Sequence, residues 1–187
     1  MVCVYIAPVT DAPMEPVWPP LRQAQLENTV DEAHRRRRYA VWKLLERGMK
    51  KSIGLSMEQL ELTLDHRGRW FCKECFFSLS HSKNAVAVAI SDAPVGIDIE
   101  ALARPMHPGL AKKILTDREQ AEFAVLEASQ KPAWLLQKWC KKESLFKWRE
   151  AAGQEADSAV SCQTGIVTVA GETYCYGITT QEEIKWN

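Results

Sequence analysis

Two carboxylates stand one residue apart in the otherwise aliphatic stretch VGIDIE, residues 95–100. Residues i and i+2 of a strand point to the same face, so Asp98 and Glu100 would lie side by side. Two such groups repel each other unless a cation lies between them, and Mg²⁺, which takes oxygen ligands, suits this role best. The alternative is a solvated polar face of an edge strand, which this tripeptide taken alone favours.

A second group of candidate residues lies on one stripe of the segment WLLQKWCKKESLFKW, residues 134–148. Trp139, Glu143 and Lys147 are spaced four residues apart, which places them along one face of a helix. Glu143 and Lys147 could form an intrahelical ion pair worth about 0.2–0.5 kcal/mol. Alternatively, Glu143 is a third metal ligand and Lys147 faces a phosphate.

Histidine and arginine side chains supply a possible anion site. His81 lies between Ser80 and Ser82 at the end of an expected strand, where it could contact a phosphate oxygen or simply be a half-exposed turn residue. The run from Arg35 to Arg38 is most often a solvated helix face. Arginine is also the side chain that holds a phosphate best, through two parallel hydrogen bonds.

The whole chain sets limits on partners and location. Its 24 basic and 24 acidic residues cancel, which argues against a basic surface for nucleic-acid binding. No apolar run approaches the roughly 20 residues that span a membrane. The six cysteines are scattered through 187 residues, which predicts reduced thiols in a cytoplasmic protein. Cys72 and Cys75 form one CxxC pair, which supplies at most two zinc ligands and is interpreted as structural or incidental.

The elements that must position these residues form an α+β pattern in which each half of the chain offers strands and a long helix. Residues 11–20 are rich in proline and predict an extended connector, and residues 66–70 predict a turn. Thr116 is expected to cap a helix within the segment 108–128, with Glu119 at capping-box spacing. The patterns predict strands over residues 1–10, 60–64, 76–79, 85–90, 95–99, 159–170 and 173–179. They predict helices over 31–51, over 108–128 with an interruption at 116–119, and over 131–152.

Three segments taken together resemble the 4′-phosphopantetheinyl transferase superfamily. FSLSHS (77–82), VGIDIE (95–100) and WCKKESLFK (139–147) match its patterns F-N-x-S-H-S, G-(I/V)-D-(I/V)-E and W-x-x-K-E-(S/A)-x-x-K in order and separation. The resemblance covers residues 35–150 well, and the length is similar to a shortened form of the single-chain type that activates surfactin synthetase. Two positions depart from the pattern: Gly68-Arg69-Trp70 replaces Gly-Lys-Pro, and Ser78 replaces the asparagine.

The resemblance implies a fold, a boundary and an activity. The fold would be two similar α+β halves related by a pseudo-twofold axis, with residues 1–94 as the coenzyme A-binding side and 95–187 as the metal-binding side of a shared active site. The activity would be transfer of the 4′-phosphopantetheine arm of coenzyme A to a serine of an acyl or peptidyl carrier protein, which releases adenosine 3′,5′-bisphosphate. The protein would act as a cytoplasmic monomer, without nucleic acid or membrane. A relative that binds coenzyme A or a carrier without transfer is the alternative.

The resemblance also implies roles for individual residues. Asp98, Glu100 and Glu143 would hold Mg²⁺ against the pyrophosphate, and Glu143 would also act as the base toward the carrier serine. Lys147 would contact the phosphate and stabilise the leaving group. Coenzyme A would be contacted by Arg38 at the adenosine 3′-phosphate, and elsewhere by Arg69, Ser80, His81, Lys142 and Lys147.

Overall fold

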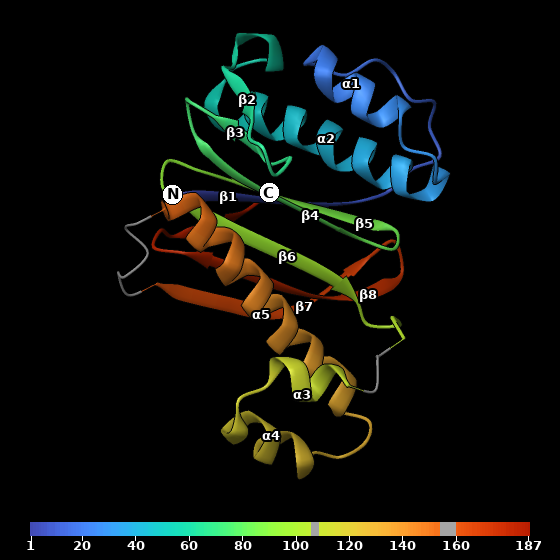
Figure 1. Cartoon of the computed structure of the whole chain (residues 1–187), viewed down its shortest axis with the longest axis vertical. Coiled ribbons are helices and arrows are strands. Elements are labelled where there is room, and N and C mark those ends of the chain that lie inside the picture. The colour runs from blue at the N-terminus through green and yellow to red at the C-terminus, as the bar shows by residue number, and fades with distance from the viewer. Residues whose placement is uncertain (106–108, 154–159) are drawn as a thin grey trace.

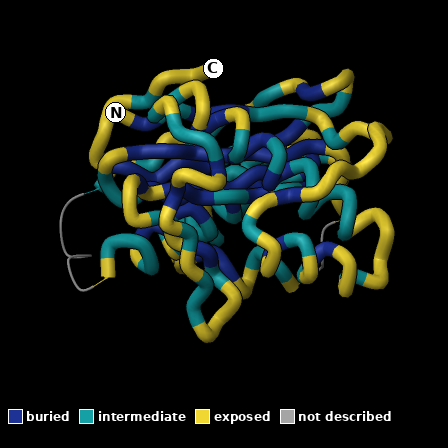
Figure 2. The backbone as a smooth tube through the Cα atoms, turned by 90° about the horizontal axis from the view of Figure 1, so that it is seen from above, coloured by how far each residue is buried: buried dark blue, intermediate teal, exposed yellow. Residues whose placement is uncertain are grey.

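The computed structural model describes residues 1–105, 109–153 and 160–187, and has a mixed α+β architecture (Figure 1). The expected helix and strand ends at Pro108 and Ala159 lie outside the described residues. Buried residues are concentrated in the strands at the middle of the molecule, and exposed residues surround them (Figure 2). Within the described ranges, no helix combines the length and apolar character needed to cross a membrane.

The first sheet carries the helix α2 on one face. Its strands follow the order β4-β5-β1-β9, with β1 (Val2–Pro8) antiparallel to β5 (Ala85–Ser91) and parallel to β9 (Ile184–Trp186). Strand β4 (Phe76–Ser82) is antiparallel to β5. Helix α2 (Glu32–Ile53) begins after the cap residue Asp31 and ends at Gly54, whose φ of 77° favours glycine. Helix α1 (Pro20–Glu27) packs beside α2.

The second sheet has the order β6-β8-β7, and α5 lies across it (Figure 1). All three strands, β6 (Val95–Ala101), β7 (Ser161–Val169) and β8 (Glu172–Thr180), are antiparallel to their neighbours. Helix α5 (Lys131–Ala152) approaches so closely that a Cβ at Gly96 would lie 1.9 Å from the Ser144 carbonyl oxygen. Glycine in β6 therefore sets the short helix–strand distance that places the polar stripe of α5 beside the carboxylates of β6.

Strand β5 forms the centre of the two-sheet core because both of its faces are buried. Val86, Val88 and Ile90 pack toward α2, whereas Ala85, Ala87 and Ala89 pack toward β6. The alanines meet the aliphatic residues of β6, namely Val95, Ile97 and Ile99, each at most 1% exposed. Small side chains on this face let the two sheets approach closely.

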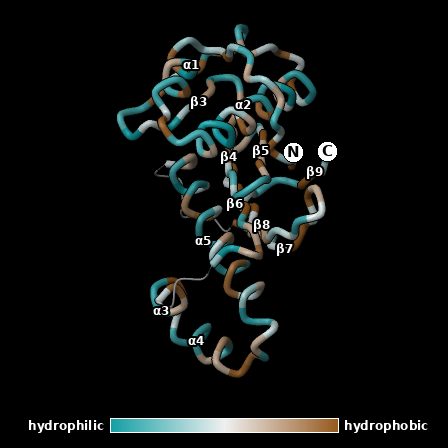
Figure 3. The backbone as a smooth tube through the Cα atoms, turned by 90° about the vertical axis from the view of Figure 1, so that its right-hand side faces the viewer, coloured by the Kyte–Doolittle hydropathy of each residue, from teal (hydrophilic) through white to brown (hydrophobic). Residues whose placement is uncertain are grey.

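The peripheral elements border the two layers. A hairpin of β2 (Leu62–Leu64) and β3 (Trp70–Cys72), preceded by the short 3₁₀ helix Met57–Gln59, lies beside α2. Helices α3 (Leu110–Ile114) and α4 (Asp117–Ala124) lie at the N-terminal end of α5 and far from α2 in two perpendicular views (Figures 1 and 3).

Most predicted elements are confirmed, including α5, which begins and ends at the predicted residues. Thr116 caps α4 through a capping box with Glu119, as predicted. Three predictions are incomplete. Pro20 starts α1 rather than ending an extended connector, Trp70 starts β3 rather than ending a turn, and β9 was not expected. Because β9 pairs with β1, the last residues of the predicted second half lie in the first sheet.

Candidate active site

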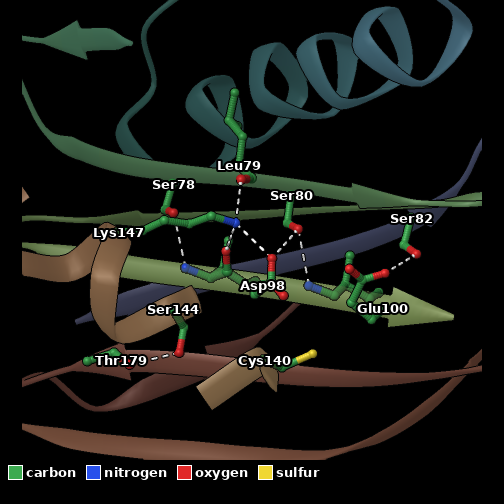
Figure 4. Close-up of polar contacts among 12 residues, drawn as sticks. Ser78, Leu79, Ser80, Ser82, Asp98, Glu100, Cys140, Ser144, Lys147 and Thr179 are labelled. Atoms are coloured by element: carbon green, nitrogen blue, oxygen red, sulfur yellow. Dashed lines mark hydrogen bonds and ion pairs between the residues drawn. The ribbon is translucent and has the colours of Figure 1, made fainter. Parts of the chain in front are cut away.

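Strands β4 and β6 belong to different sheets and are joined through serine side chains (Figure 4). The alternating residues Ser78, Ser80 and Ser82 point from β4 toward β6. Their hydroxyl oxygens accept hydrogen bonds of 3.0, 3.1 and 3.0 Å from the backbone N–H groups of residues 97, 99 and 101. The serine at position 78, where the resembled pattern has asparagine, is therefore part of a regular connection between the sheets.

The buried Asp98 and the half-buried Lys147 form an ion pair in this connection (Figure 4). Asp98 Oδ1 accepts hydrogen bonds from Lys147 Nζ at 2.8 Å and from Ser80 Oγ at 2.9 Å. Lys147 Nζ also donates to the carbonyl oxygens of Ile97 at 2.8 Å and Leu79 at 3.3 Å. These three acceptors match the three protons of the ammonium group, so Lys147 links β4, β6 and α5.

Glu100 and Glu143 lie in the electrostatic field of Asp98. Glu100 accepts a hydrogen bond of 2.7 Å from Ser82 and pairs with Arg104. Burial raises the pKa of Glu100 and of Glu143, and the negative charge of Asp98 raises both further. In the described part of the chain, no ion pair joins Glu143 to Lys147, because the lysine is turned toward Asp98.

The chemistry of these three carboxylates fits a hard cation. Asp98 Oδ2 is buried and has no hydrogen-bond partner among the described residues. Two neighbouring carboxylates have raised pKa values, which a divalent cation would reverse. The described residues contain no group of three or more His, Cys, Asp or Glu side chains that could hold a metal ion as they stand. Glu100 and Glu143 would therefore have to change rotamer to join Asp98 around one ion.

A pocket of about 480 Å³ opens beside this ion pair. Its lining includes residues of α2, which packs on the first sheet, and of α5, which packs on the second. It brings together the predicted coenzyme A contacts Arg38, Arg69, Ser80, His81 and Lys147. Lys142 does not line this pocket. Its ammonium lies 3.6 Å from Glu119 of α4, at the other end of the molecule.

His81 is a neutral pocket residue at neutral pH. Burial, together with nearby positive charges of which His34 is the first, lowers its pKa to about 4. The His34 ring meets the His81 ring edge-on at 5.6 Å between centroids. His81 can therefore offer a hydrogen bond to a phosphate but no positive charge.

Arg22 is a pocket residue that the sequence patterns did not indicate. It is 6% exposed, and its guanidinium lies 4.8 Å from the Trp42 ring. Its Nη2 donates to the Arg38 carbonyl oxygen at 3.0 Å, and its Nε has no hydrogen-bond partner among the described residues. Burial and the charge of Arg38 lower the pKa of Arg22 to about 10. Two neighbouring guanidinium groups, neither paired with a carboxylate of the described chain, suit an anionic ligand.

The edge of the pocket carries an ion pair between α5 and the β2–β3 hairpin. Glu150 of α5 lies 3.0 Å from Arg69 and 3.4 Å from Arg67, both in the β2–β3 hairpin. Arg69 Nη2 also donates to the Lys147 carbonyl oxygen at 3.2 Å. Glu150 was not among the predicted site residues, although it follows Lys147 by three residues and so lies on the same side of the helix.

Comparisons with known proteins find similarity over part of the chain. Residues 94–173 match the family model of the 4′-phosphopantetheinyl transferase superfamily. Over these residues the chain is similar to this superfamily. It is 29% identical over 107 residues to the 4′-phosphopantetheinyl transferase psf-1 of Bacillus pumilus, which covers 56% of this chain and 46% of that protein. It is 24% identical over 107 residues to a 4′-phosphopantetheinyl transferase of Bacillus subtilis, covering 56% and 47%. The chain spans about half the length of the curated relatives it matches.

The match to the 4′-phosphopantetheinyl transferase superfamily covers one wall of the site. Asp98, Glu100, Glu143 and Lys147 all lie inside residues 94–173. The pocket residues from the first half of the chain, such as Arg22, lie outside that range. Their assignment to the site therefore depends on the geometry of the pocket.

Proposed function

We propose that this protein transfers the 4′-phosphopantetheine arm of coenzyme A to a serine of an acyl or peptidyl carrier protein. The observation that carries the proposal is the direct contact among the three motif segments. Ser80 of the first segment, Asp98 of the second and Lys147 of the third are joined by two hydrogen bonds at 2.8 and 2.9 Å. The pocket beside them supplies arginines for a polyanionic substrate.

In the proposed reaction, the carrier serine oxygen attacks the phosphorus bonded to the phosphopantetheine arm, and adenosine 3′,5′-bisphosphate leaves. Glu143 takes the serine proton as the general base. Asp98, Glu100 and Glu143 would hold Mg²⁺, which neutralises the pyrophosphate when bound. Arg38 and His81 would bind the adenosine phosphate, the histidine through a neutral hydrogen bond.

Lys147 is less free to bind a phosphate in this scheme than an unpaired lysine would be. All three of its protons are already used within the protein, so a phosphate oxygen must replace one acceptor. The Leu79 carbonyl oxygen, at 3.3 Å, forms the longest of the three contacts and is the one we expect to be replaced. Lys147 would then contact the pyrophosphate while remaining anchored to Asp98.

We further propose that the two α+β halves, residues 1–94 and 95–187, are related by a pseudo-twofold axis and that a single chain is active. The layout supports this proposal, since each sheet carries one long helix, α2 or α5 (Figure 1). All six cysteines are free thiols, which suits the cytoplasm. We also propose that Lys142, which lies outside the pocket, turns from Glu119 to contact the pyrophosphate.

The test is incubation of the pure chain with coenzyme A, Mg²⁺ and a panel of apo-carrier proteins from fatty-acid, polyketide and peptide synthases, with the intact mass of each carrier as the readout. We expect at least one carrier to gain the phosphopantetheine mass, and chelation of Mg²⁺ to prevent the gain. No gain on any carrier would contradict the proposal.

A chain that binds coenzyme A without transfer is the second candidate. The observation in its favour is the pairing of Arg69 with Glu150, which occupies the residue that replaces the lysine of Gly-Lys-Pro. Calorimetry that detects coenzyme A binding by the same preparation that modifies no carrier would favour this candidate.

A further inference from the structure

The charges that line the pocket are arranged unevenly. At one end, Arg22 and Arg38 pair with no carboxylate of the described residues. At the other end, Arg67 and Arg69 both face Glu150. Glu150 is the one acidic residue among the described residues that line the pocket. Glu150 is thus a single carboxylate among several cationic side chains, and the solubility of α5 does not account for its position.

Arg69 is held in place without help from Glu150. Its Nη2 donates to the Lys147 carbonyl oxygen at 3.2 Å, and its guanidinium lies 5.0 Å from the Phe71 ring. Its backbone N–H donates at 2.8 Å to the Asp65 side chain, which fixes the hairpin turn. Loss of the carboxylate partner would therefore leave the guanidinium aimed at the pocket.

The bond between Glu150 and Arg69 is weak enough to be exchanged. The Glu150 side chain is 27% exposed and that of Arg69 is 22% exposed, so water screens the pair. A phosphate group carries more charge than a carboxylate and also forms two parallel hydrogen bonds with a guanidinium. A pyrophosphate that enters the pocket would therefore compete successfully for Arg69.

We propose that Glu150 is an internal counter-ion that occupies the anion-binding face of Arg69 in the free protein and is displaced by the pyrophosphate of the substrate. This assignment rests on the proposed function only for the identity of that substrate. It makes Glu150 a specificity-determining residue. A singly charged anion gains too little binding free energy at Arg69 to displace a carboxylate that is tethered beside it. A ligand with two or more phosphate groups gains enough binding free energy to displace Glu150.

Calorimetric titration of the full chain with inorganic pyrophosphate, in chelator, tests the exchange. The isosteric change Glu150→Gln should tighten binding about twofold to fivefold, the range of a half-exposed ion pair. Glu150→Ala should act in the same direction and keeps a good helix former in α5. The matched control Glu122→Gln removes an equal charge at a pair with Arg118 outside the pocket and should leave the affinity unchanged. Unchanged or weaker binding by both Glu150 variants would overturn the inference.

A double-mutant cycle with Arg69→Gln separates displacement from a general field effect. If Glu150 competes at Arg69, then most of the gain from Glu150→Gln should vanish in the Arg69→Gln background. An equal gain in both backgrounds would mean that the carboxylate only repels anions through space, and the exchange at Arg69 would be wrong.

The same titrations distinguish this inference from the transferase proposal. Pyrophosphate binding needs no carrier and no turnover. A chain that modifies no carrier but binds pyrophosphate more tightly after Glu150→Gln would contradict the proposed activity and support the exchange. A chain that transfers phosphopantetheine but shows no change in pyrophosphate affinity would do the reverse.

Discussion

The two ion pairs at the site differ in the burial of their carboxylates. Lys147 and Asp98, at the bottom of the site, have side chains 26% and 9% exposed. Each of the three ammonium protons of Lys147 has an acceptor within the protein. Arg69 and Glu150, at the edge, have side chains 22% and 27% exposed and share an open pocket. Removal of one partner from the first pair leaves a charge or its acceptors buried, whereas water can replace a partner of the second.

We infer from this difference that the inner pair organises the site and that the outer pair responds to a ligand. The inner pair links three elements that also carry Ser80 and Glu143, so it holds the predicted catalytic residues in register. The outer pair links a hairpin to α5 through one carboxylate. We therefore expect the effects of mutation on stability to fall steadily from the inner pair to the outer pair.

Lys147→Met should have the largest effect. It leaves Asp98, which is 6% exposed, with Ser80 as its remaining hydrogen-bond partner, and we expect a loss of about 3 kcal/mol in the free energy of unfolding. Urea denaturation measures this loss. Lys141→Met on the exposed side of the same helix is the control and should change stability by less than about 0.5 kcal/mol. Equal losses from the two variants would mean that the contact of Lys147 with Asp98 contributes no more to stability than an exposed lysine of the same helix.

Ser80→Ala should rank second, with a loss of about 2 kcal/mol. It removes both the acceptor for the Ile99 N–H and the donor to Asp98. Ser78→Ala is the matched control, because Ser78 serves only as acceptor for the Ile97 N–H in the contacts described and should cost about half as much. The free energy of unfolding of each variant, measured by thermal or urea denaturation, tests this ranking. A Ser78 variant that is the less stable of the two would contradict the role given to Asp98.

His81 should make stability depend on pH. Its pKa is about 4 in the folded chain, against 6.5 for a histidine that is not buried, so between these values the unfolded chain binds more protons. The free energy of unfolding should therefore fall as pH decreases from about 6.5 to about 4. Glu100 and Glu143, with raised pKa values, oppose this trend to the same extent in wild type and in a His81 variant. The difference between wild type and His81→Gln therefore isolates the histidine, and a difference that is independent of pH would exclude a neutral His81.

Glu150→Gln should have the smallest effect on stability, a loss under about 1 kcal/mol, because the pair at the edge is screened by water. The measurement is urea denaturation at low and at high salt, and the small loss should shrink further as salt increases. A loss as large as that of Lys147→Met would mean that the outer pair also organises the site.

Motif spacing was sufficient to select the residues of the inner pair but not to predict the pair itself. Asp98 was expected as a metal ligand, and Lys147 was expected to face Glu143 or a phosphate, whereas the structure pairs the two with each other. That the serine hydroxyls of β4 accept hydrogen bonds from β6 depends on how two sheets pack. The spacing of residues within a single strand contains no information about that packing.

The outer pair and the short elements could not be predicted for different physical reasons. Arg69 and Glu150 are 81 residues apart, and only the tertiary fold brings them together. Helix α1 was missed because Pro19 and Pro20 were interpreted as extended, although proline is favoured in the first turn of a helix. Strands β3 and β9 have three residues each, too few for a periodic pattern to distinguish them from loops.

The most direct test of the inner pair as the centre of a transferase site is the intact mass of an apo-carrier protein incubated with coenzyme A and Mg²⁺, measured in parallel for wild type and Asp98→Asn. Coenzyme A binding and circular dichroism on the same samples establish that the variant is folded. We predict that wild type adds one phosphopantetheine group to the carrier and that the folded variant adds none. A variant as active as wild type would contradict the assignment of Asp98, and with it the proposed site.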